Sequence, residues 1–226
     1  SLPSTNERAR AWVREGVEPP ALVLAHEQTG GRGRGGRSWV SRRGEGVWMS
    51  LVVAGGPPEV TSLLPLRTGL AVAPRLEALV SWPILLKWPN DLFTAEGKIG
   101  GILCEAVDGR IVVGLGVNLV APPLEVDYPV AGLGPLEPGP VVGAAVEAIV
   151  EASHRSAPTL QEDELAAWRR RDLLAGEPVV TEAGVRGRAR GIDERGRLRI
   201  VVSEGGTRTV IAGSVRRTQL ETRQRG

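Results

Sequence analysis

Residues 87–103 read Lys87-Trp88-Pro89-Asn90-Asp91-Leu92-Phe93-Thr94-Ala95-Glu96-Gly97-Lys98-Ile99-Gly100-Gly101-Ile102-Leu103. This stretch predicts a strand, a tight turn and a second strand. It contains the only two lysines of a chain with 28 basic side chains, the others being arginine. A compact ammonium and a planar guanidinium are not interchangeable where a charge must fit a confined site. We therefore predict that this segment contains the reactive groups of the protein, the alternative being that the two lysines lie close together by chance.

The turn at residues 88–91 has a structural and a functional interpretation. Proline presets one backbone angle, and Asn and Asp bond to their own backbone, which alone would explain these residues. In the functional interpretation Asn90 contacts a ligand hydroxyl, and Asp91 serves as a magnesium ligand or a hydrogen-bond partner. Lys98 is expected to point into a pocket beside Gly101, since glycine lets the backbone approach a ligand closely.

A glycine-arginine loop occupies residues 28–39 and contains five glycines, three arginines and Trp39. Successive glycine N–H groups can converge on an anion, and arginines supply planar forks for phosphate or carboxylate oxygens. Trp39 offers a face on which a nucleobase can stack. The spacing fits neither the phosphate-binding loop that ends in Lys-Ser/Thr nor the Gly-x-Gly-x-x-Gly dinucleotide motif. The alternative is a disordered linker that binds RNA weakly, but a short loop between two apolar strands favours an anion-binding site.

A third segment, Gly114-Leu115-Gly116-Val117-Asn118, has glycines at alternate positions of an expected strand. Alternate glycines remove the side chains from one face of a strand. That leaves either a flat patch on which a ring can lie or room for a close helix crossing.

Helices and strands are mixed over residues 1–175, which predicts an α+β domain. The first helix is expected to begin at Ser4 with a capping box to Glu7 and to end at Gly16. A second helix over 61–80 has Pro65 in its first turn and a kink or break at Pro74. Strands are expected at 21–28, 39–53, 84–88, 99–107 and 110–120, the last two joined by an Asp108-Gly109 hairpin, and helices at 141–155 and 160–171 after an irregular loop at 121–140.

Short alternating strands with glycine turns follow Gly176 and predict a small barrel-like second domain over residues 176–226. Its expected strands are 185–192, 198–202 and 207–211. The first of these places Arg186, Arg188 and Arg190 on one face.

Composition narrows the class of protein. Hydrophobic residues make up 42% of the 226 and charged residues 24%, as in an ordinary globular chain, and neither a membrane-spanning run nor a secretion signal is visible. A single cysteine, Cys104, suits the cytoplasm and predicts a buried, unreactive thiol. His26 and His154 lie far apart without thiolate partners, which argues against zinc. A net charge of +2 argues against coating a polyanion.

Five segments in this order resemble the biotin–protein ligase family over roughly residues 4–120. They are Ser4-Thr5-Asn6, Gln28 with Gly31 to Trp39, Lys87 to Leu92, Gly97 to Leu103, and Gly114 to Asn118. The tail resembles the SH3-like C-terminal barrel of that family, through Gly176-Glu177-Pro178-Val179 and Arg190-Gly191-Ile192-Asp193. The resemblance implies a mixed sheet flanked by helices, as in class II aminoacyl-tRNA synthetases, for residues 1–175.

The resemblance also implies a two-step reaction. Biotin and MgATP would give biotinoyl-5′-AMP and pyrophosphate, and a lysine of a biotin carboxyl carrier domain would then take the acyl group and release AMP. The implied substrates and metal are thus biotin, ATP and Mg²⁺, with no nucleic acid or membrane partner, a cytoplasmic location and a homodimer as a plausible assembly. A general base for the transfer step, metal ligands and the carrier itself are not identified.

The implied site residues follow from the matched motifs. Biotin would be held by Ser4, Thr5, Gln28, Gly31, Arg32, Arg34, Lys98 and Gly101; the nucleotide would be held by Arg32, Arg34, Trp39, Asn90, Lys98 and Asn118; and Lys98 and Arg34 would be catalytic. The pattern departs from the family at Pro3, where an acid is frequent, and at Gly35, where some members have arginine. Because the sequence begins without a winged-helix region before Ser4, the resemblance leads us to expect the monofunctional class. The alternatives are lipoate or octanoate transfer within the same superfamily and, from another class, an arginine-glycine nucleic-acid-binding protein.

Overall fold

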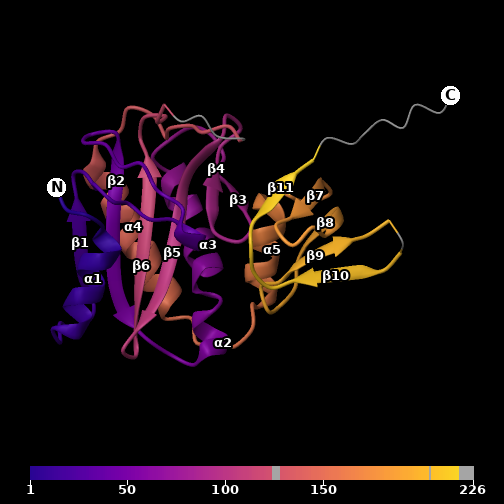
Figure 1. Cartoon of the computed structure of the whole chain (residues 1–226), viewed down its shortest axis with the longest axis horizontal. Coiled ribbons are helices and arrows are strands. Elements are labelled where there is room, and N and C mark those ends of the chain that lie inside the picture. Colours follow the sequence, from indigo (N-terminus) through magenta and orange to yellow (C-terminus); the bar gives the residue numbers. More distant parts are fainter. Residues whose placement is uncertain (124–127, 204, 219–226) are drawn as a thin grey trace.

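A computed structural model describes residues 1–123, 128–203 and 205–218. The main sheet has six strands in the order β1-β2-β6-β5-β4-β3 (Figure 1). Every neighbouring pair in it is antiparallel, so the sheet is antiparallel throughout and not mixed as expected. The strands are β1 (Ala21–Ala25), β2 (Gly46–Ala54), β3 (Leu85–Lys87), β4 (Asp91–Phe93), β5 (Lys98–Val107) and β6 (Arg110–Asn118).

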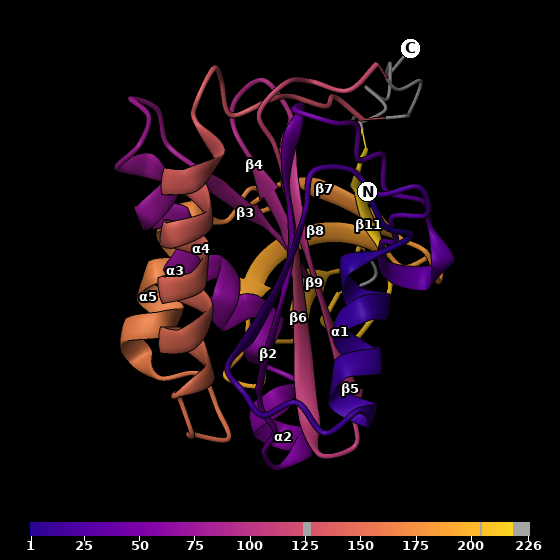
Figure 2. The same cartoon turned by 90° about the vertical axis from the view of Figure 1, so that its left-hand side faces the viewer.

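Helices cover both faces of this sheet, which gives the expected α+β architecture (Figure 2). On one face lies α1 (Thr5–Arg14), and on the other lie α3 (Leu64–Glu77), α4 (Pro138–Ser153) and α5 (Glu162–Arg171). The long strands are buried on the side of α3 and α4 by residues such as Met49, Leu51 and Leu115. No helix among the described residues is long and apolar enough to cross a membrane.

Several local predictions are confirmed. Asp108 and Gly109 both have positive φ, 43° and 75°, in the β5–β6 turn, as a two-residue hairpin requires. Gly16 ends α1 with φ 83°, and α4 and α5 lie within two or three residues of their expected bounds.

The predicted capping box and a break at Pro74 are both absent. Ser4 is the N-cap of α1 but makes no side-chain cap bond, and the Glu7 carboxylate pairs with Arg32 instead. The capping box is therefore absent because a charged partner on the glycine-arginine loop competes for Glu7. Pro74 lies in the last turn of α3 and does not break it; the expected helix is divided earlier, between α2 (Pro58–Thr61) and α3.

The C-terminal region forms a five-stranded antiparallel sheet in the order β10-β9-β8-β7-β11. Its strands are β7 (Pro178–Thr181), β8 (Arg186–Ile192), β9 (Leu198–Val201), β10 (Thr207–Val210) and β11 (Val215–Arg217). Among the described residues β10 does not pair with β11, so the expected barrel is an open sheet. One face of this sheet, including Ala189, Leu198 and Val215, joins the same buried cluster as Leu86 and Trp88 of the main sheet.

Candidate active site

A cavity of about 900 Å³ lies over the main sheet, enclosed by the glycine-arginine loop, the start of α1 and the C-terminal sheet. On the side of β1 and β2 it is lined by Ser4, Thr5 and Gln28, and on the side of β3 to β5 by Lys87, Asp91 and Lys98. The cavity therefore joins a neutral polar end to a charged end.

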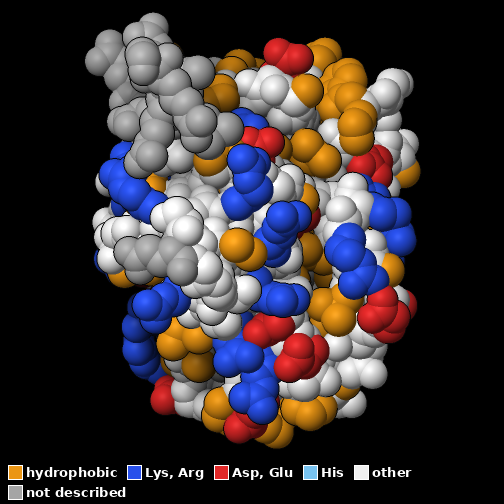
Figure 3. Space-filling model, turned by 90° about the vertical axis from the view of Figure 1, so that its right-hand side faces the viewer, with side chains coloured by type: hydrophobic (Ala, Val, Ile, Leu, Met, Phe, Trp, Pro, Cys, Tyr) orange, Lys and Arg blue, Asp and Glu red, His pale blue; other side chains and the backbone are white. Residues whose placement is uncertain are grey.

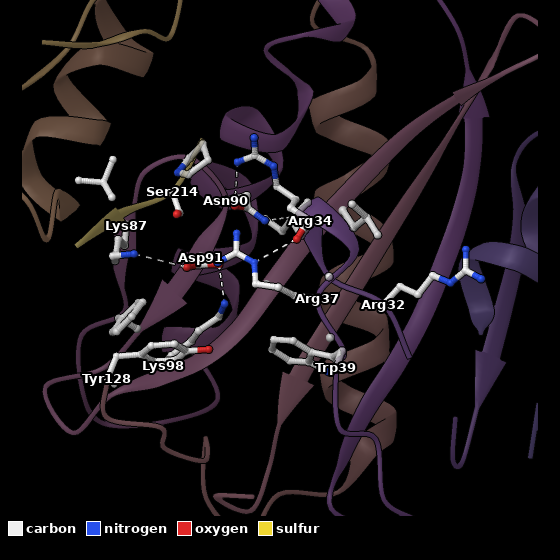
Figure 4. Close-up of a pocket in the computed structure, with 18 of the residues that line it drawn as sticks. Arg32, Arg34, Arg37, Trp39, Lys87, Asn90, Asp91, Lys98, Tyr128 and Ser214 are labelled. Atoms are coloured by element: carbon white, nitrogen blue, oxygen red, sulfur yellow. Dashed lines mark hydrogen bonds and ion pairs between the residues drawn. The ribbon is translucent and has the colours of Figure 1, made fainter. Parts of the chain in front are cut away.

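Asp91 lies between the two lysines of the chain (Figure 4). Its carboxylate is 2.7 Å from the Lys98 ammonium and 3.8 Å from the Lys87 ammonium. The register explains this contact: Lys87 is opposite Asp91 across β3 and β4, and a bulge after Leu92 places Lys98 opposite Phe93. Desolvation lowers the pKa of Lys87, and the charge of Asp91 opposes that shift. Two ammonium groups share one carboxylate, so the cluster has positive charge left for an anionic ligand.

Lys98 also has aromatic neighbours. Its ammonium lies 5.2 Å from the centre of the Trp39 ring and 5.8 Å from that of Tyr128. Ring faces attract a cation at this range, so Lys98 is held inside the cavity and not directed into bulk solvent. Its side chain is only 14% exposed.

Asn90 holds Arg34 in place. Its amide nitrogen donates to the Ile102 carbonyl at 2.6 Å, which turns the amide oxygen toward Arg34, and the Arg34 guanidinium donates to that oxygen at 3.3 Å (Figure 4). Burial lowers the pKa of Arg34, while the nearby charge of Asp91 raises it. Asn90 thus acts in this structure by positioning an arginine that faces the cavity.

At the neutral end, Gln28 accepts from the backbone N–H of Thr5 at 2.7 Å and from its hydroxyl at 3.1 Å. The Gln28 amide nitrogen donates to Ser41 at 2.7 Å. These bonds set the orientation of the amide. Ser4, beside them and 2% exposed, has a hydroxyl that no helix cap uses.

Ser50 and Asn6 extend this network beneath the cavity. The Asn6 amide nitrogen donates to Glu105 at 2.7 Å, so its oxygen must accept, and the Ser50 hydroxyl lies 2.6 Å from it. Ser50 also lies 2.8 Å from the Thr5 hydroxyl. The Ser50 hydroxyl donates its proton to Asn6. The Thr5 hydroxyl has one proton, which it can donate either to Gln28 or to Ser50. The Thr5 hydroxyl can therefore reorient when a ligand binds.

The alternate glycines of β6 make room for side chains of this same chain. A Cβ atom at Gly114 would lie 2.1 Å from the Asn6 amide oxygen, and one at Gly116 would lie 2.7 Å from the Trp39 indole nitrogen. Both sequence interpretations are thus realised, since α1 crosses closely at Gly114 and a ring lies on Gly116. That indole nitrogen is buried and has no hydrogen-bond partner among the described residues.

Three predicted residues lie apart from the charged cluster. Arg32 pairs with Glu7 on α1, its side chain is 55% exposed, and it points away from Lys98 and Asp91 (Figure 4). Gly31 does not line the cavity; a Cβ there would lie 2.4 Å from the Trp39 carbonyl oxygen. Asn118 is 2% exposed and donates to the Ala131 carbonyl at 3.3 Å, outside the cavity lining. Arg32 nevertheless lines the cavity, as do the remaining predicted residues, Ser4, Thr5, Gln28, Arg34, Trp39, Asn90, Lys98 and Gly101.

The sequence did not reveal the contribution of the C-terminal sheet. Glu182, Arg186, Ser214 and Arg216 line the cavity from β7, β8, β11 and their connections. Ser50 was missed as well, although a lone polar residue inside the apolar run 46–54 was a signal. Cys104 is partly buried and not fully buried as predicted, but desolvation raises the pKa of its thiol to about 12, which keeps the thiol protonated.

The cavity offers little to a metal ion on its own. No group of three or more His, Cys, Asp or Glu side chains that could hold one occurs within residues 1–123, 128–203 and 205–218. Asp91 is engaged by two lysines. Mg²⁺ usually binds through one or two carboxylates together with phosphate oxygens, so the residues fit an ion that arrives with a nucleotide as part of the substrate.

A neutral hydrogen-bonding end and a cationic end in one cavity define a protein that binds a ligand with an anionic group. Residues 1–119 match the model of the biotin/lipoate A/B protein ligase family, and residues 176–216 match that of the biotin protein ligase C-terminal domain. The chain belongs to the biotin/lipoate A/B protein ligase family.

Individual relatives agree with this assignment. The biotin–[acetyl-CoA-carboxylase] ligase of Mycobacterium tuberculosis is 34% identical, covering 94% of this chain and 85% of that protein. The enzyme of the same name from Paracoccus denitrificans is 30% identical over 94% and 96%. Among solved structures, the biotin protein ligase of Aquifex aeolicus in complex with biotin and ATP has a TM-score of 0.81 and 29% identity, covering 96% of both chains.

Proposed function

We propose that this protein is a biotin–protein ligase, which activates biotin with MgATP and transfers it to a lysine of a biotin carboxyl carrier domain. The observation that carries the proposal is the pairing of Lys98 and Asp91 at 2.7 Å in the cavity that Thr5 and Gln28 also line. One end suits the uncharged ureido ring of biotin, and the other suits a carboxylate next to phosphate. The relatives named above support the choice of substrates.

The first step joins two anions. A carboxylate oxygen of biotin bonds to the α-phosphorus of ATP, the bond from that phosphorus to the bridging oxygen breaks, and pyrophosphate leaves. Lys98 and Arg34 would offset the repulsion and the charge that builds up in the transition state, since fixed cations in a water-poor site stabilise developing charge strongly. Asp91 and Asn90 already hold these two cations in place before substrate binds.

In the second step the neutral amine of the carrier lysine attacks the acyl carbon, the bond to the phosphate oxygen breaks to release AMP, and the nitrogen gives up one proton to water. The mixed anhydride hydrolyses readily, so the glycine-arginine loop would have to close over it. Arg32 would need to leave Glu7 to join the ligand. We place this reaction in the cytoplasm, which the single unpaired cysteine suits.

The decisive experiment is mass spectrometry of a carrier domain after incubation with this protein, biotin and MgATP. A gain of one biotin on the carrier, absent when ATP is omitted, is the expected result. Lipoate in place of biotin is the second arm, because the matching family includes lipoate ligases. Transfer of lipoate alone would reassign the substrate. If neither biotin nor lipoate causes release of pyrophosphate, the proposal is overturned.

A further inference from the structure

The C-terminal sheet has two unlike faces. Val179, Ala189 and Ile200 are buried in the common core, whereas the side chains that alternate with them point outward. The five strands together contain seven arginines and no carboxylate. The register puts Arg208 opposite Ile200 and Arg217 opposite Val179, so the other five arginines are on the outer face. Glu182, just after β7, is a carboxylate that lines the cavity with them. A solvent-facing sheet usually mixes both signs of charge, so this excess of arginine favours a partner of the opposite sign.

Strand register connects this outer face to the active-site cavity. Arg216, Val180 and Arg186 form one row across β11, β7 and β8, and all three line the cavity. The next row, farther from the cavity, runs from Pro178 through Arg188 and Val201 to Thr207. Since residues opposite each other in a sheet point to the same side, the face continues from the mouth of the cavity across the sheet.

Most charges on this face have no local counterion. Arg186, Arg190 and Arg199 are exposed and form no ion pair with any residue that the structure describes, and the Arg188 guanidinium donates only to a backbone carbonyl. Basic side chains are spread over the side of the molecule that carries this sheet (Figure 3). Neighbouring like charges repel, so a negative partner would gain from meeting them.

We propose that the outer face of the C-terminal sheet, defined by Arg186, Arg188, Arg190, Arg199 and Arg216, is the docking surface for the carrier domain, which presents acidic residues around its acceptor lysine. This proposal rests on the function proposed above. The acceptor lysine must reach a cavity that already contains Lys98 and Arg34, so its own charge is repelled. Carboxylates on the carrier, meeting the arginines at the mouth, would offset that repulsion and set the approach.

A protein partner fits this face better than a nucleic acid. No Phe, Trp or Tyr occurs in the five strands, whereas single-stranded nucleic acids are held by aromatic stacking as well as charge. Pro178, Val180 and Val201 lie among the arginines, and arginine beside apolar groups is typical of protein interfaces.

The test uses the double variant Arg190→Ser/Arg199→Ser, because neither residue lines the cavity and neither side chain makes a hydrogen bond to the part of the chain that the structure describes. Arg14→Ser/Arg170→Ser, which removes two exposed arginines from α1 and α5, is the matched control. The probe is the biotin-accepting domain of an acetyl-CoA carboxylase, alone and with the Asp and Glu residues near its acceptor lysine changed to Asn and Gln. Pyrophosphate release with biotin and MgATP is measured without carrier, and kcat/KM for the carrier is measured at low and high salt.

We expect the double variant to lose about 5- to 30-fold in kcat/KM for the carrier at low salt, with a weaker salt dependence, while pyrophosphate release changes less than about twofold. The neutralised carrier should reduce kcat/KM similarly with the parent protein and add nothing further with the variant. The control variant should behave like the parent protein.

Five results would overturn the proposal. Equal kcat/KM for the parent and the double variant would show that this face has no role in transfer. An equal loss in the control variant would show that the effect comes from net charge and not from this face. A parallel loss of pyrophosphate release would place the arginines in activation. Loss of binding to a single-stranded RNA 20-mer, with transfer unchanged, would assign the face to nucleic acid. If the parent protein releases pyrophosphate but never modifies a carrier, the proposed function fails first, and the docking surface with it.

Discussion

The indole nitrogen of Trp88 donates to the carbonyl oxygen of Gly196 at 2.9 Å, and this bond fastens the active-site turn to the C-terminal sheet. Trp88 directly precedes Pro89, Asn90 and Asp91, so whatever holds the indole also holds the residues that position Arg34 and Lys98. Gly196 belongs to the β8–β9 turn with φ 71°, and a Cβ there would lie 2.5 Å from a methyl carbon of Leu66 in α3. The C-terminal sheet is therefore part of what shapes the site.

Trp88→Phe should test this connection. The change keeps most of the buried ring but leaves the Gly196 carbonyl without a partner, which typically costs about 1–3 kcal/mol of unfolding free energy. Urea unfolding should show that loss, and pyrophosphate release at a temperature where the variant is folded should fall as well. Trp82→Phe, at a side chain that is 43% exposed, is the control and should change neither. Full activity in Trp88→Phe would show that the hydrogen bond from Trp88 to Gly196 contributes to stability and not to the activity of the site.

Lys98→Ala should slow adenylate formation by about 10²–10³, because it removes a fixed cation where negative charge develops. The measurement is single-turnover pyrophosphate release with biotin and MgATP. Lys98→Arg should recover only part of the rate, since a planar guanidinium cannot take the place of an ammonium that lies 2.7 Å from Asp91 and over the Trp39 ring. An unchanged rate in the alanine variant would remove Lys98 from the mechanism.

Gly116→Ala should displace the Trp39 ring. The new methyl group would lie 2.7 Å from the indole nitrogen, closer than carbon and nitrogen can approach without movement. We expect the KM for ATP to rise about tenfold with a smaller effect on biotin binding, measured by pyrophosphate release and by calorimetry. Gly143→Ala in α4, where nothing lies within 4 Å of the added carbon, should instead stabilise the protein by about 0.5–1 kcal/mol. Equal KM values in the two variants would contradict the stacking role of Trp39.

Glu77 should contribute stability that depends on pH. Its carboxylate binds Arg171 through two hydrogen bonds and accepts from the Ile84 N–H at 2.7 Å, which holds the start of β3 against α3 and α5. The hydrogen bond from Arg171, opposed by partial burial, lowers the pKa of Glu77 below its ordinary value of 4.5. A carboxylate with a lowered native pKa stabilises the fold fully above its unfolded pKa and loses that stability as pH falls through the native pKa.

We therefore expect Glu77→Gln to lower the unfolding free energy by about 1 kcal/mol at pH 7, the side chain being partly exposed. The difference from the parent protein should shrink steadily below pH 4.5. Urea unfolding of both proteins between pH 3 and pH 7 measures it. A difference that is constant over this range would show that the charge of Glu77 contributes nothing.

Much of the fold and of the charged cluster could be predicted from patterns between residues close together in the sequence. The Asp108-Gly109 turn, the order of elements and the gathering of Lys87, Asp91 and Lys98 all depend on neighbours within about a dozen residues. A strand, a tight turn and a returning strand bring the ends of such a segment together whatever the rest of the chain does. The alternate glycines of β6 likewise predicted a face without side chains. They did not predict which side chains would pack against that face.

Contacts between distant segments could not be predicted in this way. Glu7 favours a local cap by its spacing from Ser4, yet pairs with Arg32, because the folded loop offers it a full charge in place of a backbone N–H. Asn118 ends a motif that points to a ligand but donates to Ala131 outside the cavity. The hydrogen bonds of Ser50 beneath the cavity and the cavity wall formed by the C-terminal sheet depend on strand order across the whole chain.

By itself, then, the sequence determined which segments carry charge, where the chain turns and which family it resembles, since those properties reside in residue types and their local spacing. Only the tertiary structure decided which partner each charged group takes and that an arginine-bearing sheet face opens onto the active site. The physical reason is that a charge or a hydrogen-bonding group accepts any suitable partner within a few ångströms, and packing of distant elements selects among them.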